Sequence, residues 1–524
     1  MSIFDKIQLQ RPSRSTFTMD REIKLSHKFD FLYPILCEEI LPSDRWSSRG
    51  PEVMLRCAPM LAPLMHRVNV CTYTFFVPNR LLWKNFEKWS TGGEDGLQEP
   101  LKPRLLVGAG GADGYWKKGT LADYLGVPPL PNDTSNTTGT FEIDAAPFKA
   151  TALIWNEYFR DQNLQTELDI QFDSDGQLTL TGDLLALKKK AWYKDYFTSA
   201  LPFSQRGPEV TLPITLGYKQ VTNVIDASGG TDPLPVNDAV ITNNNPDWQQ
   251  GSVKTTTGNR PLRFENIDAA STGFTINDLR KATKLQEWYE RAAIGGSRYV
   301  EQVMAFYGQR SSDARFDRPE FLSAARIPIT LSEVLQTGAT VTSSGPLAQT
   351  PQGNLAGHGI SVGSGAGYSR NFEEHGWLMT FLCVSPVTAY QNGLHKKWTR
   401  FDRLEVYYPQ FAHLGEEDIF NHEIYFSLQA GEADNMSTFG YQSRHASYKH
   451  GQSSVHGDFR DTLSFWHLGR QFSSRPVLDG KFVEQDARTD IFAVDDGTDY
   501  FWTQIYYPIK ANRPMPYYGT PRLT

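Results

Sequence analysis

The sequence lacks the features that would place it in a membrane or in a disulfide-stabilised secreted fold. Its longest apolar runs, such as residues 376–387, are less than half the length that a bilayer span requires. The first residues contain no apolar core of the length that a signal peptide needs. We therefore expect neither membrane insertion nor secretion by that route. The four cysteines, for which we expect buried reduced thiols, are Cys37, Cys57, Cys71 and Cys383.

Positive charge is also scarce relative to negative charge. The chain of 524 residues has a formal net charge of −7, so it is not an electrostatic binder of nucleic acid as a whole. Any contact with DNA or RNA must come from a local patch or from a basic partner. What the chain does have is 40% hydrophobic and 13% aromatic residues, which excludes wholesale disorder and favours a sheet-rich, aromatic-packed interior.

Sequence motifs of catalysis are missing. There is no GxSxG elbow, no P-loop and no cysteine in a recognisable nucleophile context. The paired glycines Gly295 and Gly296 follow a helical pattern, whereas a phosphate cradle needs them to follow a strand. The GSGAG run at 363–367 lacks the strand before it and the helix after it that a dinucleotide fingerprint requires. We therefore predict that the protein is not an enzyme and uses no cofactor.

Two segments contain acidic residues and histidines at spacings that partly resemble metal sites. Asp173-Ser174-Asp175-Gly176 resembles half of a calcium loop but lacks its remaining ligands and closing Glu, so we predict a hairpin turn between strands at 168–172 and 177–183. The spacing of the second cluster matches no zinc pattern, and we predict surface or interface polar residues and no bound metal. Its members are His413, Glu416, Glu417, His422 and Glu423.

The hydrophobic pattern indicates β-strands separated by very long connections. Amphipathic helical spacing appears within these connections at 79–89 and 151–163. Strands and helices do not alternate regularly, which favours an antiparallel sandwich with large inserted loops over a doubly wound α/β sheet. The predicted strands include 28–36, 66–78, 208–218, 377–384, 403–411, 422–429 and 499–511.

Residues 276–308 predict two helices that meet at a corner. An apolar stripe runs from Leu279 to Ala292, and charged residues at helical spacing pair on the opposite face. Gly295 and Gly296 break the first helix, and a second helix is expected up to Gly308. The preceding residues, 219–275, show no hydrophobic periodicity and are rich in Asn, Thr, Gly, Asp and Pro. This is typical of an exposed protrusion or a disordered segment.

Several long blocks of the chain resemble the major capsid protein of Microviridae, most closely the gokushovirus branch of these small single-stranded DNA bacteriophages. The blocks run in order from the N-terminal region to the C-terminus and leave out chiefly residues 219–275. They include "FTMDREIKLSHKFDFLYPILCEEILPSDRW", "TYTFFVPNRLLWKNFEKW", "ALIWNEYFRDQNL", "KDYFTSALPFSQRGPEVTLPI", "LRKATKLQEWYERAAIGGSRYVEQVMAFYGQRSSDARFDRPEFL", "TPQGNLAGHG" and "RPMPYYGTPRL".

The resemblance implies a mainly β fold, an eight-stranded antiparallel viral jelly roll with long helix-containing insertions. It implies an N-terminal arm at 1–27 and a single capsid domain at 28–524. Copies of such a chain assemble in the host cytoplasm into a T=1 icosahedral shell, the virion capsid, around a circular single-stranded DNA genome. A small basic DNA-packaging protein assists, which accords with an acidic shell protein.

In gokushovirus-like shells, a long insertion forms a protrusion at the threefold axes. Residues 219–275 are the candidate by position and composition, and we expect this loop to contact a host surface receptor such as a carbohydrate. The candidate receptor-contacting residues are Asn243, Asn244, Asn245 and Trp248.

For DNA contact, the sequence offers cations interleaved with aromatic residues. Lys510 lies close in sequence to Tyr506 and Tyr507, and stacking combined with charge holds single strands without sequence preference. An intersubunit ion pair is the alternative for each of these cations. We also expect the N-terminal arm to lie on the inner surface near the genome. The candidate DNA-binding residues are Arg11, Arg14, Arg291, Arg298 and Lys510.

A structural shell protein is the leading hypothesis. The alternative is a carbohydrate-binding or host-attachment protein built on a jelly roll that does not form the shell, which the aromatic richness and the polar loop at 219–275 motivate. A third class, a hydrolase on a β-sandwich, would depend on His413 or Glu417. Particle size separates the first two, because a shell protein sediments as uniform DNA-filled spheres and a lectin as a monomer or small oligomer.

Overall fold

The computed structural model describes residues 13–207, 276–295 and 317–518, together with Ala305. Short gaps fall at 94–96, 109–112, 130–139, 336–339, 342–348, 351–354, 430 and 495–497, and between 216 and 271 only the backbone of short strands is described. The chain divides into two compact units. Unit 1 comprises Met1–Ser204 and Ser311–Thr524, and unit 2 comprises Gln205–Arg310.

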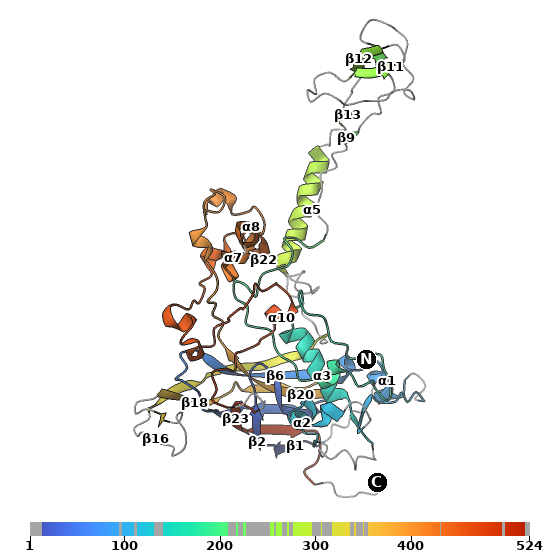
Figure 1. Ribbon diagram of the computed structural model, residues 1–524. Coiled ribbons are helices and arrows are strands. Elements are labelled where there is room, and N and C mark those ends of the chain that lie inside the picture. Colours follow the sequence, from blue (N-terminus) through green and yellow to red (C-terminus); the bar gives the residue numbers. More distant parts are fainter. Residues whose placement is uncertain are drawn as a thin grey trace. The chain divides into compact units, whose positions relative to one another are not determined.

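Unit 1 is built on eight antiparallel strands in two sheets (Figure 1). One sheet has the order β2-β23-β5-β18, extended by β15 (Thr330–Leu335), and the other has the order β3-β20-β6-β14. Numbered one to eight along the chain, these orders are 1-8-3-6 and 2-7-4-5, the jelly-roll arrangement of two Greek keys. The strands are β2 (Arg21–His27), β3 (Tyr33–Ile40), β5 (Glu52–Cys57), β6 (Val68–Pro78), β14 (Glu320–Pro328), β18 (Leu355–Ser364), β20 (Gly376–Pro386) and β23 (Phe501–Tyr507).

The central strands β6 and β20 of one sheet are buried on both faces, and we call this sheet the covered sheet. Its inner side chains pack against those of the other sheet, as Val70 and Leu382 do against Leu55. Its outer face carries Phe75 and Phe381, which pack against the helical residues from Ala150 to Phe159. Burying each such side chain contributes about 1.5–3 kcal/mol. The strands predicted at 66–78 and 377–384 are confirmed as β6 and β20.

The sheet that contains β5 and β23 has one exposed face, and we call it the open sheet. Buried and exposed residues alternate along β5, and along β23 the exposed or half-buried positions are Trp502, Gln504 and Tyr506. This period of two is that of a strand with one face on the core and one in solvent. The strand predicted at 499–511 is confirmed as β23 followed by β24 (Ile509–Arg513).

The N-terminal residues belong to the sheets from residue 15 onward. β1 (Ser15–Thr18) pairs with β24, and β2 pairs with β23 over Arg21–His27. β24 also pairs with β4 (Arg45–Ser48), and β4 with β19 (Tyr368–Asn371), to form a third sheet. Residues 15–27 of the predicted N-terminal arm are therefore paired into the sheets, because their backbone hydrogen bonds are made within the chain. Residues 1–12 lie outside the described part.

Two long insertions carry the helices of unit 1, as expected. The first joins β6 to β14, and the second joins β20 to β23. The described elements of the first insertion within unit 1 include α1 (Phe86–Thr91), β7 (Arg104–Val107), α2 (Leu121–Leu125), β8 (Phe141–Asp144), α3 (Ala146–Ile154) and α4 (Gly182–Leu185). Those of the second include β21 (Glu417–Phe420), α7 (Asn421–Ile424), α8 (Gly431–Asn435), β22 (Thr438–Gln442), α9 (Ala446–Lys449) and α10 (Gly480–Val483).

The helices predicted in the first insertion are confirmed only in part. The one predicted at 151–163 begins earlier, as α3, and continues as a π-helical turn over Trp155–Phe159. The one predicted at 79–89 is interrupted between a 3-10 turn at Asn79–Leu81 and α1. Trp83, which lies in this interruption, donates from Nε1 to Asp175 at 2.6 Å.

The strands predicted at 403–411 and 422–429 are wrong. The first segment forms turns and a short 3-10 helix at Pro409–Phe411, and a side chain binds its backbone: Arg444 donates to the carbonyl of Leu404 at 2.6 Å. The second begins with the helical turn α7, where Glu423 accepts from the amide nitrogen of Phe420 at 3.1 Å.

Two further strand boundaries differ from the prediction. The strand expected at 28–36 begins only at Tyr33, since Asp30 has a φ of 77° and its carboxylate accepts from the amide nitrogen of Ala487 at 2.7 Å. The strands expected at 168–172 and 177–183 do not form a ladder.

Unit 2 contains a helix and short strands. α5 (Ile276–Gly295) ends at Gly295 as predicted, and Glu287 pairs with Lys284 at 2.6 Å and with Arg291 at 3.3 Å along it. The second helix of the predicted pair lies outside the described residues, apart from Ala305.

The stretch at 219–275, expected to be irregular, contains strands. A three-stranded antiparallel sheet has the order β10-β12-β11, and a further pair joins β9 to β13. Their bounds are β9 (Leu216–Gly217), β10 (Val224–Asp226), β11 (Ser252–Thr255), β12 (Gly258–Phe264) and β13 (Ala270–Ser271). The stretch therefore contains short strands although its sequence shows no period, and its role as an exposed protrusion stays a prediction.

Candidate functional site

Two of the predicted DNA-binding residues lie in unit 1, one just before β1 and one on β24, and a third lies on α5 in unit 2. Arg14 donates from Nε to Asn512 at 2.7 Å, which ties the start of β1 to β24. Lys510 is exposed on β24, opposite Thr18 of β1. Arg291 pairs with Glu287 along α5 in unit 2.

The remaining predicted site residues lie outside the described part of the chain. This holds for two of the DNA-binding candidates and for all of the receptor-loop candidates. They are Arg11, Arg298, Asn243, Asn244, Asn245 and Trp248.

The exposed face of the open sheet brings together a group of residues that the sequence reasoning missed. In the strand register Trp502 lies opposite Ser26 of β2 on one side and Arg56 of β5 on the other. Two residues further along β23, on the same face, Gln504 lies opposite Lys24. Lys24, Arg56 and Trp502 line one shallow groove together with Met54 and Gln504. We call Lys24, Arg56 and Trp502 the basic-aromatic patch.

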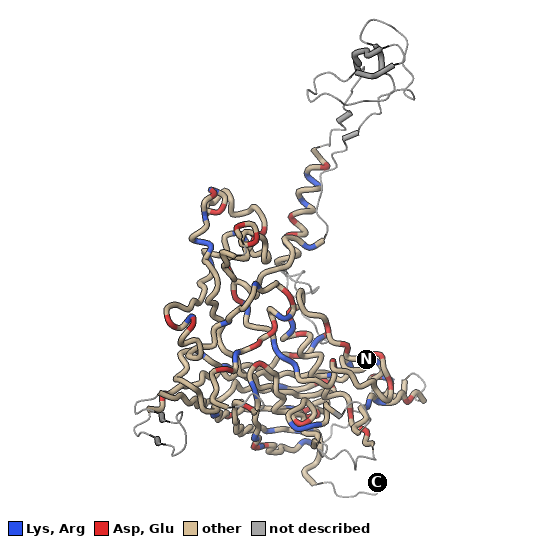
Figure 2. Tube along the Cα trace, viewed as in Figure 1, with Lys and Arg blue, Asp and Glu red and all other residues tan. Residues whose placement is uncertain are grey.

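The same face becomes acidic at its other end. Tyr506 lies opposite Glu22 and Glu52, and its hydroxyl donates to Asp20 at 2.9 Å. Figure 2 shows that basic and acidic positions are interspersed over the rest of unit 1 as well. A polyanion would therefore meet attraction at the basic-aromatic patch and repulsion at the acidic end of the same face. Sequence spacing alone does not reveal this patch, because its members come from three strands whose register is known only once the sheet is formed.

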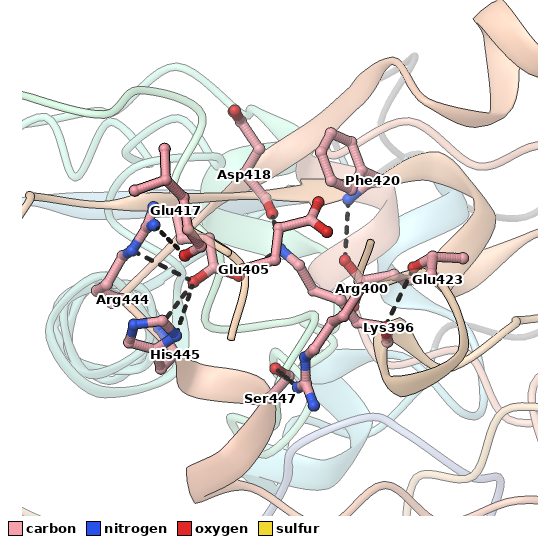
Figure 3. A network of polar contacts seen from close by, with 12 residues as sticks. Lys396, Arg400, Glu405, Glu417, Asp418, Phe420, Glu423, Arg444, His445 and Ser447 are labelled. Carbon is pink, nitrogen blue, oxygen red and sulfur yellow. Dashed lines mark hydrogen bonds and ion pairs between the residues drawn. The ribbon is translucent and has the colours of Figure 1, made fainter. Parts of the chain in front are cut away.

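A second polar group lies in the insertion between β20 and β23, where Glu417 is surrounded by donors (Figure 3). Its carboxylate pairs with Lys396, lies 3.9 Å from the Arg444 guanidinium, and accepts from the amide nitrogen of His445 at 2.8 Å. Burial alone would raise the pKa of Glu417, but the hydrogen bond and charge of Lys396 lower it. Glu417 is therefore held as a carboxylate by cations of its own chain.

The neighbouring Glu423 is held differently. It accepts from the hydroxyl of Tyr196 at 2.9 Å and is almost fully buried. Burial raises the pKa of Glu423 to about 7, although the charge of Lys396 opposes the shift. His422 contacts the hydroxyl of Thr399 and the carbonyl of Asn435 through its two ring nitrogens.

The described residues contain no cluster of three His, Cys, Asp or Glu side chains that could hold a metal ion. Glu417, His422 and Glu423 instead fix the fold of the insertion. In the turn resembling half a calcium loop, Asp175 accepts from Trp83 and Asn85, and Asp173 pairs with Lys84 at 3.0 Å. These carboxylates therefore join the turn to residues 83–85.

An eight-stranded jelly roll with long insertions is an architecture of viral shell proteins, among other classes. The chain matches the family described as Capsid protein (F protein) over residues 5–523, and it belongs to that family. This confirms the resemblance found in the sequence, and it identifies a structural virion protein rather than an enzyme.

Named relatives agree with this assignment. The chain is 34% identical to Capsid protein VP1 of Bdellovibrio phage phiMH2K, over 99% of this chain and 97% of the relative. It is 30% identical to Capsid protein VP1 of Chlamydia phage 1, again over 99% and 97%. It is also 30% identical to Capsid protein VP1 of Spiroplasma virus 4, over 90% of this chain and 88% of the relative.

Among the helices of the described residues, none has the length and apolarity to cross a bilayer.

Proposed function

We propose that copies of this chain assemble in the host cytoplasm into a T=1 icosahedral shell around a circular single-stranded DNA genome. Membership of the capsid family supports the shell. The basic-aromatic patch on the open sheet supports the DNA contact, because it is an exposed surface on which a base can stack beside two cations. With a net charge of −7, the chain leaves most of the phosphate charge to a small basic packaging protein.

The patch suits a single strand better than a duplex. A base freed from pairing stacks on an aromatic ring such as Trp502, which contributes about 1–3 kcal/mol per base. Arg56 lies opposite Trp502 in the strand register, and Lys24 lies diagonally across from it, opposite Gln504, so the two cations can contact phosphates on either side of the stacked base. The contact needs no sequence preference, since every base has an aromatic face.

Two measurements test this function. The assembled protein should sediment as uniform virus-sized particles that contain DNA, whereas only monomers or small oligomers would favour the attachment-protein alternative. Trp502→Ala in dissociated subunits should weaken binding to an oligo-dT strand by roughly 5- to 150-fold, the equivalent of one stacked base. Trp398→Ala removes an exposed tryptophan elsewhere and should leave that affinity unchanged. Equal affinities for the wild type and the Trp502→Ala variant would refute the DNA contact.

We also propose that residues 219–275 form the surface protrusion that contacts a host receptor, with Asn243, Asn244, Asn245 and Trp248 as candidate contacts. The separation of unit 2 from unit 1 supports this, because a separate unit can be changed without disturbing the jelly roll. Deleting most of 219–275 should leave a soluble, folded chain with altered host range or particle stability. An insoluble truncated chain would show that the segment belongs to the core.

A further inference from the structure

The second insertion exposes a series of large apolar side chains between Trp398 and Tyr408. Phe401 has 91% of its surface exposed and Trp398 66%. Leu404, Tyr407 and Tyr408 each expose between 44% and 52%. Large apolar groups that share one exposed surface indicate an interaction site. We call residues 398–408 the aromatic segment.

The aromatic segment is fixed to the body of the insertion by polar contacts on its inner side (Figure 3). Arg400 donates to the hydroxyl of Ser447 at 2.6 Å, and its guanidinium lies 3.8 Å from the centre of the Tyr448 ring. Arg444 donates to the carbonyl of Leu404 at 2.6 Å. Just before the segment, the buried Lys396 donates to the carbonyl of Asp418 at 2.9 Å.

These contacts hold the exposed rings in place before any partner arrives. Tyr407 packs edge-on against His445, with 5.3 Å between ring centres, and His445 in turn lies 6.1 Å from Tyr448. The half-exposed Tyr448 therefore extends the same surface. Burying charged groups such as Lys396 and Glu417 is costly unless they are paired. The buried charges fix the backbone that carries the exposed rings, so a partner would bind a surface that is already ordered.

We propose that a second copy of this chain docks on the aromatic segment and Tyr448. The proposal rests on the proposed shell, whose subunits must bury part of their surface against one another. With about 200 Å² for a large aromatic side chain, the exposed fractions of the five rings amount to roughly 600 Å². A standard interface takes about 800 Å² from each partner, so these rings with Leu404 provide most of one half-interface.

The charges in the segment favour a protein surface over the genome. Its two carboxylates, Asp402 and Glu405, balance its two cations, Arg400 and Arg403, so residues 398–408 carry no surplus of positive charge to attract phosphates. The cations Lys396 and Arg444 are turned inward to Glu417, where they cannot reach an outside polyanion. The aromatic segment and the basic-aromatic patch are thus two different surfaces, one for a subunit and one for DNA.

A photo-crosslinking amino acid with a benzophenone side chain, introduced at position 401 of the full chain, identifies the occupant. Irradiated particles should give a product of twice the chain mass, and dissociated subunits should not. A crosslink to DNA or to another protein, or no crosslink at all, would overturn the proposal. The same group at position 502 should crosslink to DNA. If the wild-type chain forms no particles, the proposed function fails and this inference fails with it.

Substitutions test whether the surface is needed for assembly. Phe401→Ser should lower the yield of particles at least tenfold, while the thermal unfolding midpoint of dissociated subunits stays that of the wild type, because the ring is almost fully exposed. Phe141→Ser is the matched control, since that ring is 72% exposed on β8, which pairs with β7 in the first insertion, and it should leave the yield unchanged. Wild-type yield for Phe401→Ser, or equal losses in both variants, would overturn the assignment.

Discussion

The two sheets of the jelly roll differ in what lies on their outer faces. In the covered sheet, ten of the eleven residues of β20 are buried, so neither face of this strand meets solvent. In the open sheet, β23 alternates, and its outer positions carry Trp502 and Tyr506. Both long insertions leave from strands of the covered sheet, β6 and β20. One sheet therefore serves mainly as the base of the insertions, while the other keeps a surface available for binding.

If the open sheet contacts DNA as proposed, stability and binding depend on opposite sides of one core. A change on the outer face of the covered sheet removes packing between sheet and helices. A change on the outer face of the open sheet removes only a partly hydrated side chain, so its effect should appear in binding and not in stability. Three experiments follow, from the largest expected effect to the smallest; the first and the last test this division, and the second tests a buried carboxyl group of the second insertion.

Phe381→Ala tests the covered sheet. The ring is 1% exposed and packs under α3, so its loss should leave a cavity and lower the free energy of unfolding by about 3–5 kcal/mol. Trp502→Ala, on the open sheet, should lower it by about 1 kcal/mol or less. Urea unfolding of dissociated subunits, followed by circular dichroism, measures both values. Comparable losses in the two variants would show that the two outer faces do not differ in this way.

Much of this division could be predicted from the sequence, because the hydrophobic pattern is strong where a strand is buried. Residues 66–78 and 377–384 are nearly continuous apolar runs, and they are the central strands β6 and β20. The helix at 276–295 was equally clear from its period and from the glycine at its end. The antiparallel sandwich with large insertions followed from long connections between such strands.

The sequence failed where tertiary contacts decide the local structure. The alternating pattern at 403–411 looks like a strand, but most of its apolar residues are exposed, and the backbone of Leu404 is bound by Asp402 and Arg444. The arm predicted at 1–27 includes β1 and β2, and the partners of these strands lie almost 500 residues away, where no local pattern can indicate them. The basic-aromatic patch needs the register of three strands, which no local pattern specifies.

The second experiment measures how the buried carboxyl group of Glu423 makes the stability of the fold depend on pH. Burial gives Glu423 a folded-state pKa of about 7 against an ordinary 4.5, so the folded protein keeps this proton where the unfolded chain has lost it. The stability that the proton provides is complete below about pH 4.5 and is lost as the pH rises through 7, by up to about 3 kcal/mol. Glu423→Gln carries no such proton and keeps groups that can bond to Tyr196 and Phe420.

The difference in unfolding free energy between the Glu423→Gln variant and the wild type should therefore grow between pH 4.5 and pH 7 in favour of the variant. Asp30, whose pKa burial raises to about 6, titrates in both chains, so the difference isolates Glu423. Urea midpoints at half-unit pH steps give the curve. Two parallel curves would show that Glu423 is ionised in the folded protein throughout, and that Lys396 outweighs its burial.

The smallest effect concerns the open sheet itself. Arg56→Gln should not change the unfolding free energy by more than about 0.5 kcal/mol, because the side chain is exposed. It should weaken binding of an oligo-dT strand a few-fold, and it should reduce the slope of log affinity against log salt by about 0.7, the value for one phosphate contact on a single strand. Fluorescence anisotropy between 50 and 200 mM salt measures that slope. Lys117→Gln removes an exposed cation from the first insertion, so the same slope change in that variant would mean that DNA binding follows total charge and that the open face has no special part in it.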